Sequence, residues 1–115
     1  MAFDSITPVK LGQAAITVLP VLVHTVPALS RSIVKTIDIC NTTTSDINVN
    51  IYLVPSGDTP TTANALLANI KIKATTTSGG FVQWGGSQVL NEGDTIQASA
   101  SAVGLTINIS GGEAA

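Results

Sequence analysis

The chain is poor in the side chains that carry out chemistry: it has one cysteine, one histidine and four aromatic residues among 115 residues. Its seven acidic residues are scattered singly, and no HxH, CxxC or HExxH motif accompanies the single histidine, His24. Catalytic and metal-binding sites need such groups at defined spacing. The composition therefore predicts neither an enzyme nor a bound metal or other cofactor, and a lone Cys40 excludes a disulfide within the chain.

Charge is scarce as well. Only 10% of the residues are charged and the formal net charge is −2, whereas soluble proteins average about 25% charged residues. The five basic residues are dispersed, so no basic patch could follow a phosphate backbone, and we expect no direct contact with nucleic acid. No uncharged apolar run approaches the roughly 20 residues of a membrane span, and the first residues lack the order of a signal peptide. We expect neither a membrane partner nor secretion.

Residues that favour β-strands are abundant, since Thr, Val and Ile supply 38 of the 115 residues. The clearest strand pattern spans residues 47–54, where every second residue is apolar. These apolar residues are Ile47, Val49, Ile51 and Leu53. Similar runs recur about every ten residues. We therefore predict an all-β fold: a single-domain antiparallel β-sandwich, jelly-roll-like, with about seven to nine strands.

The predicted sandwich covers residues 13–112. An irregular N-terminal arm is expected over residues 1–12, because Thr7-Pro8 and Leu11-Gly12 interrupt any period there. An arm of this kind can add a strand to a neighbouring subunit. Residues 113–115 are expected to form a C-terminal tail.

Three shorter segments carry local predictions. Strands over residues 32–40 and 47–54 are expected to form a long hairpin, because a short polar stretch separates them. Residues 62–70 are rich in Ala and Leu, so we expect a short helical turn or an irregular segment. Gly93 is expected to supply the left-handed residue of a tight reversal, with Glu92 and Asp94 facing solvent or accepting from backbone amides.

A weakly charged, β-prone surface leaves sheet edges open to pairing with other chains. We therefore expect a homo-oligomer, with a trimer as the favoured form. The candidate contacts with other subunits or with a shell are Phe3, Ile6, Tyr52 and Trp84. Trp84 could instead plug the edge of the core, and His24 is expected to be structural or exposed. Tyr52, on the polar side of its strand, leaves open a carbohydrate- or receptor-binding module.

Three segments also carry a resemblance to a known group of proteins. They are Thr25-Val26-Pro27-Ala28 leading into residues 32–37, then residues 50–57 (NIYLVPSG), then residues 89–98 (VLNEGDTIQA). In this order they resemble the small β-rich virion structural proteins of tailed bacteriophages, over about residues 13–112. The chain departs from the pattern of that group at residues 28–31, where a glycine-containing turn is expected.

The resemblance implies a structural protein of the virion. It favours a capsid decoration, or cement, protein that stabilises the head through oligomeric contacts with itself and with the major capsid protein or other virion proteins. Location on the capsid surface and synthesis in the host cytoplasm would follow. A tail, baseplate or fibre-associated adaptor is the alternative, and a carbohydrate- or receptor-binding module is a further one.

Overall fold

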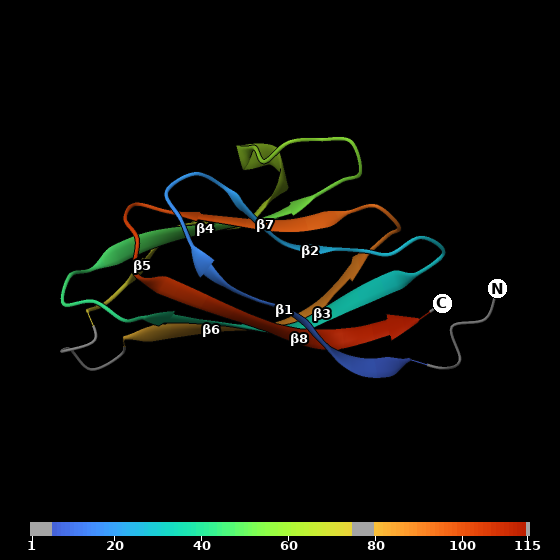
Figure 1. Cartoon of the computed structure of the whole chain (residues 1–115), viewed down its shortest axis with the longest axis horizontal. Helices are drawn as coiled ribbons and strands as arrows, with labels where there is room; N and C mark the ends of the chain where they lie inside the picture. The colour runs from blue at the N-terminus through green and yellow to red at the C-terminus, as the bar shows by residue number, and fades with distance from the viewer. Residues whose placement is uncertain (1–5, 75–79, 115) are drawn as a thin grey trace.

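The computed structural model describes residues 6–74 and 80–114, and most of them belong to strands (Figure 1). Eight strands and one 3₁₀ turn follow one another along this part of the chain. The strands are β1 (Thr7–Ile16), β2 (Val21–Thr25), β3 (Arg31–Asn41), β4 (Ile47–Val54), β5 (Ala65–Ile72), β6 (Phe81–Leu90), β7 (Thr95–Ala100) and β8 (Leu105–Ala114). The 3₁₀ turn, η1, spans Thr62–Asn64 and lies on the outer side of the layer that contains β4 (Figure 1).

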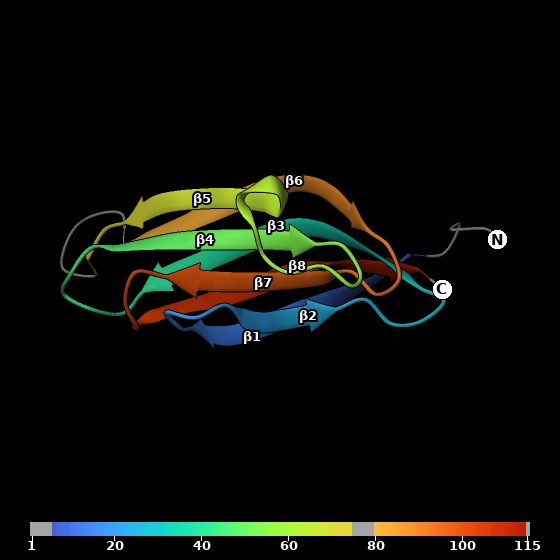
Figure 2. The ribbon, with the colours of Figure 1, turned by 90° about the horizontal axis from the view of Figure 1, so that it is seen from above.

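The strands form two four-stranded antiparallel sheets that face each other (Figures 1 and 2). Sheet A has the order β1-β8-β3-β6, and sheet B has the order β2-β7-β4-β5. Every connection except the one between β4 and β5 crosses from one sheet to the other. This alternation is the topology of a jelly roll. It confirms the predicted all-β antiparallel sandwich, with eight strands in the described residues.

The predicted hairpin between residues 32–40 and 47–54 is wrong, although both strands are present. β3 pairs with β6 and β8 in sheet A, whereas β4 pairs with β5 and β7 in sheet B. The short connection carries the chain across the core. There the buried amide of Asn41 donates to the carbonyls of Ser45 at 2.7 Å and Ile72 at 3.1 Å. The period of a strand fixes which face is buried, not which sheet the strand joins.

The core lies between the sheets and consists mainly of aliphatic side chains from both. In β4 the predicted buried face is confirmed, because Ile47, Val49 and Ile51 are at most 2% exposed. Leu53 is half-buried while Val54 is buried, and the pairing of β4 with β5 becomes irregular just before this end of the strand. The alternation therefore holds over most of the strand and fails where the pairing does.

The N-terminal arm is shorter than predicted. Residues 7–12 were expected to be irregular, but they are the first part of β1 and pair with β8. A bulge between Lys10 and Gly12 shifts the register, and Leu11 at that point is buried in the core. The bulge removes the two-residue period, so the sequence pattern does not reveal the strand. Residues 1–5 lie outside the described residues.

The C-terminal tail is shorter as well, since Glu113 and Ala114 are the last residues of β8. In the sequence, Gly111 suggests the end of a strand. In the structure it lies inside β8 and allows neighbouring strands to pack closely. A Cβ at Gly111 would overlap the carbonyl oxygen of Ile33 in β3. Glycine inside a strand often marks such an approach of one backbone to another. Ala115 lies outside the described residues.

The predicted helical turn over residues 62–70 is right only for its beginning. η1 covers Thr62–Asn64, and β5 starts at Ala65. Pairing with β4 places Leu67 opposite Ile51, whose side chain is fully buried. A helix of nine residues is only marginally stable by itself, so burial in the sheet outweighs the helical propensity of this segment.

The predicted reversal around Gly93 is confirmed. Gly93 has a φ of 84°, and both neighbouring carboxylates accept from backbone amides. Asp94 accepts from the amide of Ser56 at 3.0 Å, and Glu92 accepts from the amide of Leu29 at 2.6 Å. Leu29 itself has a φ of 61°, which a non-glycine residue rarely adopts. The Glu92 contact therefore helps to hold a strained turn between β2 and β3.

Candidate functional site

An apolar groove crosses the outer face of sheet A, where β1 begins and β8 ends. One register row of the sheet forms its floor and far wall. The row consists of Pro8, Gly112, Ile33 and Val89, one residue from each strand. The groove, called the sheet A groove below, has a volume of about 320 Å³, and its lining is completed by Ile6, Lys35, Ser87 and Gly111. It therefore runs across the strands, from edge strand β1 to edge strand β6.

The middle of the groove is hollow because Gly112 has no side chain. A Cβ at this position would stand 2.5 Å from Cγ2 of Ile6, so Ile6 packs directly over the glycine. The walls are apolar and open to solvent, with Ile6 47% and Val89 59% exposed. The amino group of Lys35 lies at the rim and donates to the hydroxyl of Ser87 at 2.8 Å. Aliphatic side chains aligned in this way favour contact with another apolar surface.

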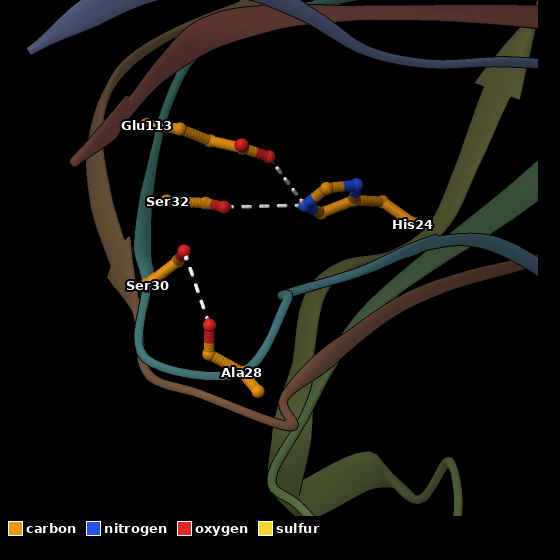
Figure 3. Close-up of polar contacts among 5 residues, drawn as sticks. All are labelled: His24, Ala28, Ser30, Ser32 and Glu113. Atoms are coloured by element: carbon orange, nitrogen blue, oxygen red, sulfur yellow. Dashed lines mark hydrogen bonds and ion pairs between the residues drawn. The ribbon is translucent and has the colours of Figure 1, made fainter. Parts of the chain in front are cut away.

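On the inner side of sheet A, next to the groove, His24 joins the two sheets (Figure 3). His24 belongs to β2 in sheet B. Its Nε2 lies 3.2 Å from the hydroxyl oxygen of Ser32 and 3.8 Å from a carboxylate oxygen of Glu113, and both partners belong to sheet A. Ser32 and Glu113 directly adjoin Ile33 and Gly112 in the sequence. This His24 link therefore ties sheet B to the two strands that form the centre of the groove.

A bulge in β2 accounts for the inward position of His24. The pairing of β2 with β7 shifts between Leu22 and His24, so the two-residue period fails there. The His24 side chain is only 10% exposed. This burial lowers the pKa of His24 from its usual 6.5, while the carboxylate of Glu113 and a hydrogen bond to the Leu11 backbone act in the opposite direction.

The His24 link does not have the geometry of a nucleophilic triad. In such a triad the serine and the carboxylate occupy opposite ring nitrogens of the histidine. Ser32 and Glu113 both face Nε2, and Ser32 is fully buried. The arrangement can join the sheets and respond to pH, and it leaves no exposed hydroxyl for attack on a substrate.

The outer face of sheet B is different, because its polar side chains bond to one another. Asn50 donates to the hydroxyl of Ser99 at 3.4 Å and accepts from the backbone amide of Asn69 at 2.8 Å. Asn48 donates to the side-chain oxygen of Asn69 at 3.0 Å. Asn69 has a φ of 53° and lies where the pairing of β5 is irregular. This amide ladder therefore fixes a bend in β5.

The candidate contacts predicted from the sequence lie on separate parts of the molecule. Ile6 forms a wall of the sheet A groove, and Tyr52 is half-buried on sheet B. Trp84 packs against the core from edge strand β6, with its ring over Gly86. Phe3 lies outside the described residues. Tyr52 and Trp84 belong to different sheets, so they do not form the shared aromatic platform that a sugar site would use.

The sequence pattern missed the main residues of the groove, which are Ile33, Val89 and Gly112. Each comes from a different strand, and the row exists only through the register of the whole sheet. One signal was present: two adjacent glycines, Gly111 and Gly112, follow the alternating strand pattern of residues 105–110 and precede a charged residue.

Other features of the described residues are less organised. Val18 and Leu19, in the connection between β1 and β2, and Val103, in the connection between β7 and β8, are exposed. Cys40 is exposed near the end of β3. Across residues 6–74 and 80–114, no three His, Cys, Asp or Glu side chains gather as a metal site requires, and no helix is long and apolar enough to cross a membrane.

These observations define the chain as a single-domain antiparallel β-sandwich with jelly-roll topology and an apolar groove on one outer face. No protein-family model and no curated protein sequence matches it. Among solved structures, a chain in the structure of infectious bursal disease virus, Gx strain, is similar at 16% sequence identity and a TM-score of 0.32. The match covers 97% of this chain and 29% of that chain, so this protein spans less than a third of the viral chain's length.

Proposed function

We propose that this protein is a structural component of a tailed-bacteriophage virion and decorates the capsid as a homo-oligomer. The observation that carries the proposal is the sheet A groove, an uncovered apolar row on a chain with only 10% charged residues. The resemblance of residues 13–112 to phage virion proteins supports the same role.

The fold is compatible with this role but does not select it. Jelly rolls occur in viral capsid proteins, in lectins and in cupins, and a fold alone does not determine function. The site favours assembly, because the groove is apolar and the amide ladder on the other sheet is already satisfied by its own hydrogen bonds.

The size of the groove sets what it can do. Complete burial of a Val or Ile side chain contributes about 1.5–3 kcal/mol, so covering the exposed parts of Ile6 and Val89 contributes roughly 2 kcal/mol in total. Association of two free proteins costs about 4–15 kcal/mol. The groove is therefore one part of a larger contact that includes the flanking edge strands β1 and β6. Several such contacts acting together would hold an oligomer on a shell.

Co-sedimentation with capsids that lack the protein tests this proposal. Wild type should pellet with the capsids, and Val89→Asp should stay in the supernatant, because it places a charge in the groove. Leu22→Asp is the matched control, since Leu22 is 56% exposed on an edge strand of the other sheet, against 59% for Val89. It should pellet like wild type.

Equal binding of all three proteins would contradict a role for the groove. Binding of wild type to isolated tails instead of capsids would replace the decoration role with that of a tail adaptor. Electron microscopy of the virion would then locate the protein and give its copy number and symmetry, for which we propose a trimer.

A further inference from the structure

An apolar turn projects from the same end of the sandwich as the sheet A groove. It spans residues 27–30, between β2 and β3, and is called the Leu29 turn below. The turn lies next to the end of β8, because Arg31, which follows it, pairs with Ala114 (Figure 2). Leu29 is 80% exposed, the largest value among the large apolar side chains of the described residues. The turn therefore presents an apolar side chain to solvent and does not fill the groove of its own chain.

The backbone of this turn has a conformation that leucine disfavours. The Ser30 amide donates to the Pro27 carbonyl at 3.3 Å, and Leu29, at the third position of the turn, has a φ of 61°. Glycine or asparagine usually occupies such a position. Glu92, in the connection between β6 and β7, holds the turn through its 2.6 Å bond to the Leu29 amide. Backbone strain of this kind is common at functional sites. A strained leucine that buries little surface in its own chain points to a contact outside the chain.

The Leu29 turn and the sheet A groove are complementary in chemistry. The groove is apolar and hollow, and the turn offers an exposed leucine. Glu92 is also exposed, and it uses Oε2 for the Leu29 amide, so Oε1 can accept a further bond. At the rim of the groove, the Lys35 amino group donates to a neutral hydroxyl. Among the described residues, no carboxylate lies within ion-pair distance of Lys35. The turn thus carries the apolar side chain and the negative charge that the groove and its rim can bind.

We propose that the Leu29 turn of one copy docks into the sheet A groove of a second copy, with Leu29 against Val89 and the Glu92 carboxylate beside the Lys35 amino group. A rotation axis next to this end of the sandwich would bring the turn of each copy to the groove of the next. Head-to-tail contacts of this kind can close into a ring, as the proposed trimer requires. The inference rests on the proposed function, because it names the occupant of the groove through which the copies assemble.

Removal of the leucine side chain tests the occupant. Burial of a leucine corresponds to roughly a 10- to 100-fold change in an association constant. In Leu29→Gly the dissociation constant of the oligomer, measured by sedimentation equilibrium, should therefore rise by about tenfold or more. Glycine accepts a positive φ but makes the unfolded chain more flexible, so the melting temperature should change little.

Leu19→Gly is the matched control, since Leu19 is 77% exposed in the connection between β1 and β2. It should assemble like wild type. An unchanged dissociation constant in Leu29→Gly, or an equal rise in Leu19→Gly, would overturn the proposal.

Disulfide formation between two separately purified proteins tests the position of the turn. Both carry Cys40→Ser, and one carries Leu29→Cys while the other carries Val89→Cys. Mixed under mild oxidation, they should form a disulfide-linked heterodimer. Docking raises the effective concentration of the two thiols, so the reaction should be about tenfold or more faster than between Leu19→Cys and Val89→Cys. Equal rates would overturn the proposal. Faster linkage between two Val89→Cys chains would also overturn it, because it would place groove against groove.

Co-sedimentation with capsids separates this inference from the proposed function. A fast disulfide between Leu29→Cys and Val89→Cys, combined with no capsid binding by wild type, would uphold the docking and overturn the decoration role. Wild-type capsid binding by Leu29→Gly, with an unchanged oligomer mass, would uphold the decoration role and overturn the docking.

Discussion

The outer faces of the two sheets differ in the side chains that they expose to solvent. On sheet B the amides of Asn48, Asn50 and Asn69 bond to one another and to Ser99, so the polar groups of this part of the face are satisfied without a partner. On sheet A the row that ends at Val89 is apolar and exposed to solvent, and the neighbouring side chains of the sheet do not cover it. Polar groups that bond to one another within a sheet contribute to the stability of the fold. An apolar surface that stays exposed to solvent is available for association with another protein.

The largest expected effect comes from the core beneath the amide ladder. Ile51 is fully buried in β4, so Ile51→Asp places an unpaired charge between the sheets. The cost should be about 3–5 kcal/mol, a large share of a typical domain stability of about 5–15 kcal/mol. We expect insoluble or unfolded protein by circular dichroism. A soluble variant with wild-type melting would disprove the position of this strand.

A smaller effect is expected for the amide ladder itself. Asn50→Ala removes the acceptor for the Asn69 amide and the donor to Ser99. Two hydrogen bonds of about 1 kcal/mol each, one of them long, give an expected loss of about 1–2 kcal/mol in denaturant unfolding. Wild-type stability would show that the ladder does not hold the bend in β5.

The His24 link should give a smaller effect that depends on pH. Because burial lowers the pKa of His24 below 6.5, the folded state takes up a proton less readily than the unfolded state. Neutral, buried His24 therefore makes its full contribution to the free energy of unfolding above pH 6.5. This contribution is lost as the pH falls through the lower pKa that His24 has in the folded protein. Melting temperature should therefore fall on acidification, and less steeply in His24→Gln. Glu113→Gln removes the carboxylate that raises the pKa of His24, so the pKa of His24 falls further and the fall in melting temperature should extend to lower pH. Parallel pH profiles for all three proteins would show that His24 is not buried as described.

The smallest effect on stability is expected at the sheet A groove. Val89→Asp changes an exposed side chain, and substitutions of this kind usually alter the free energy of unfolding by less than about 0.5 kcal/mol. Its melting temperature should equal that of Leu22→Asp within a degree or two. A large loss for Val89→Asp alone would mean that the row is part of the core, and the contrast between the two faces would fail.

The sequence predicts the strands better than their arrangement, for reasons visible at particular residues. Alternation around Ile51 and the glycine at Gly93 are local signals, and both predictions are confirmed. The bulge at Leu11 and the irregular pairing at Asn69 break the period, so β1 and β5 were not predicted as strands over their full lengths. The partner sheet of β4 depends on contacts distant in the sequence, which no local pattern contains.

The candidate site was predicted less well, because it is assembled from register. Ile6 was expected to be a contact residue, and it forms a wall of the groove. Its partner Gly112 belongs to the other end of the chain, as does Glu113, which approaches His24. Since Glu113 was expected in a tail, no pattern could pair it with a histidine in the second strand.

Sedimentation equilibrium at micromolar concentration most directly tests the central claim that association uses the sheet A groove. Wild type, Val89→Asp and Leu22→Asp should be compared in the same buffer. The account predicts an oligomer, in our proposal a trimer, for wild type and Leu22→Asp, and a monomer for Val89→Asp. An oligomer of unchanged mass in Val89→Asp, or a monomeric wild type, would contradict it.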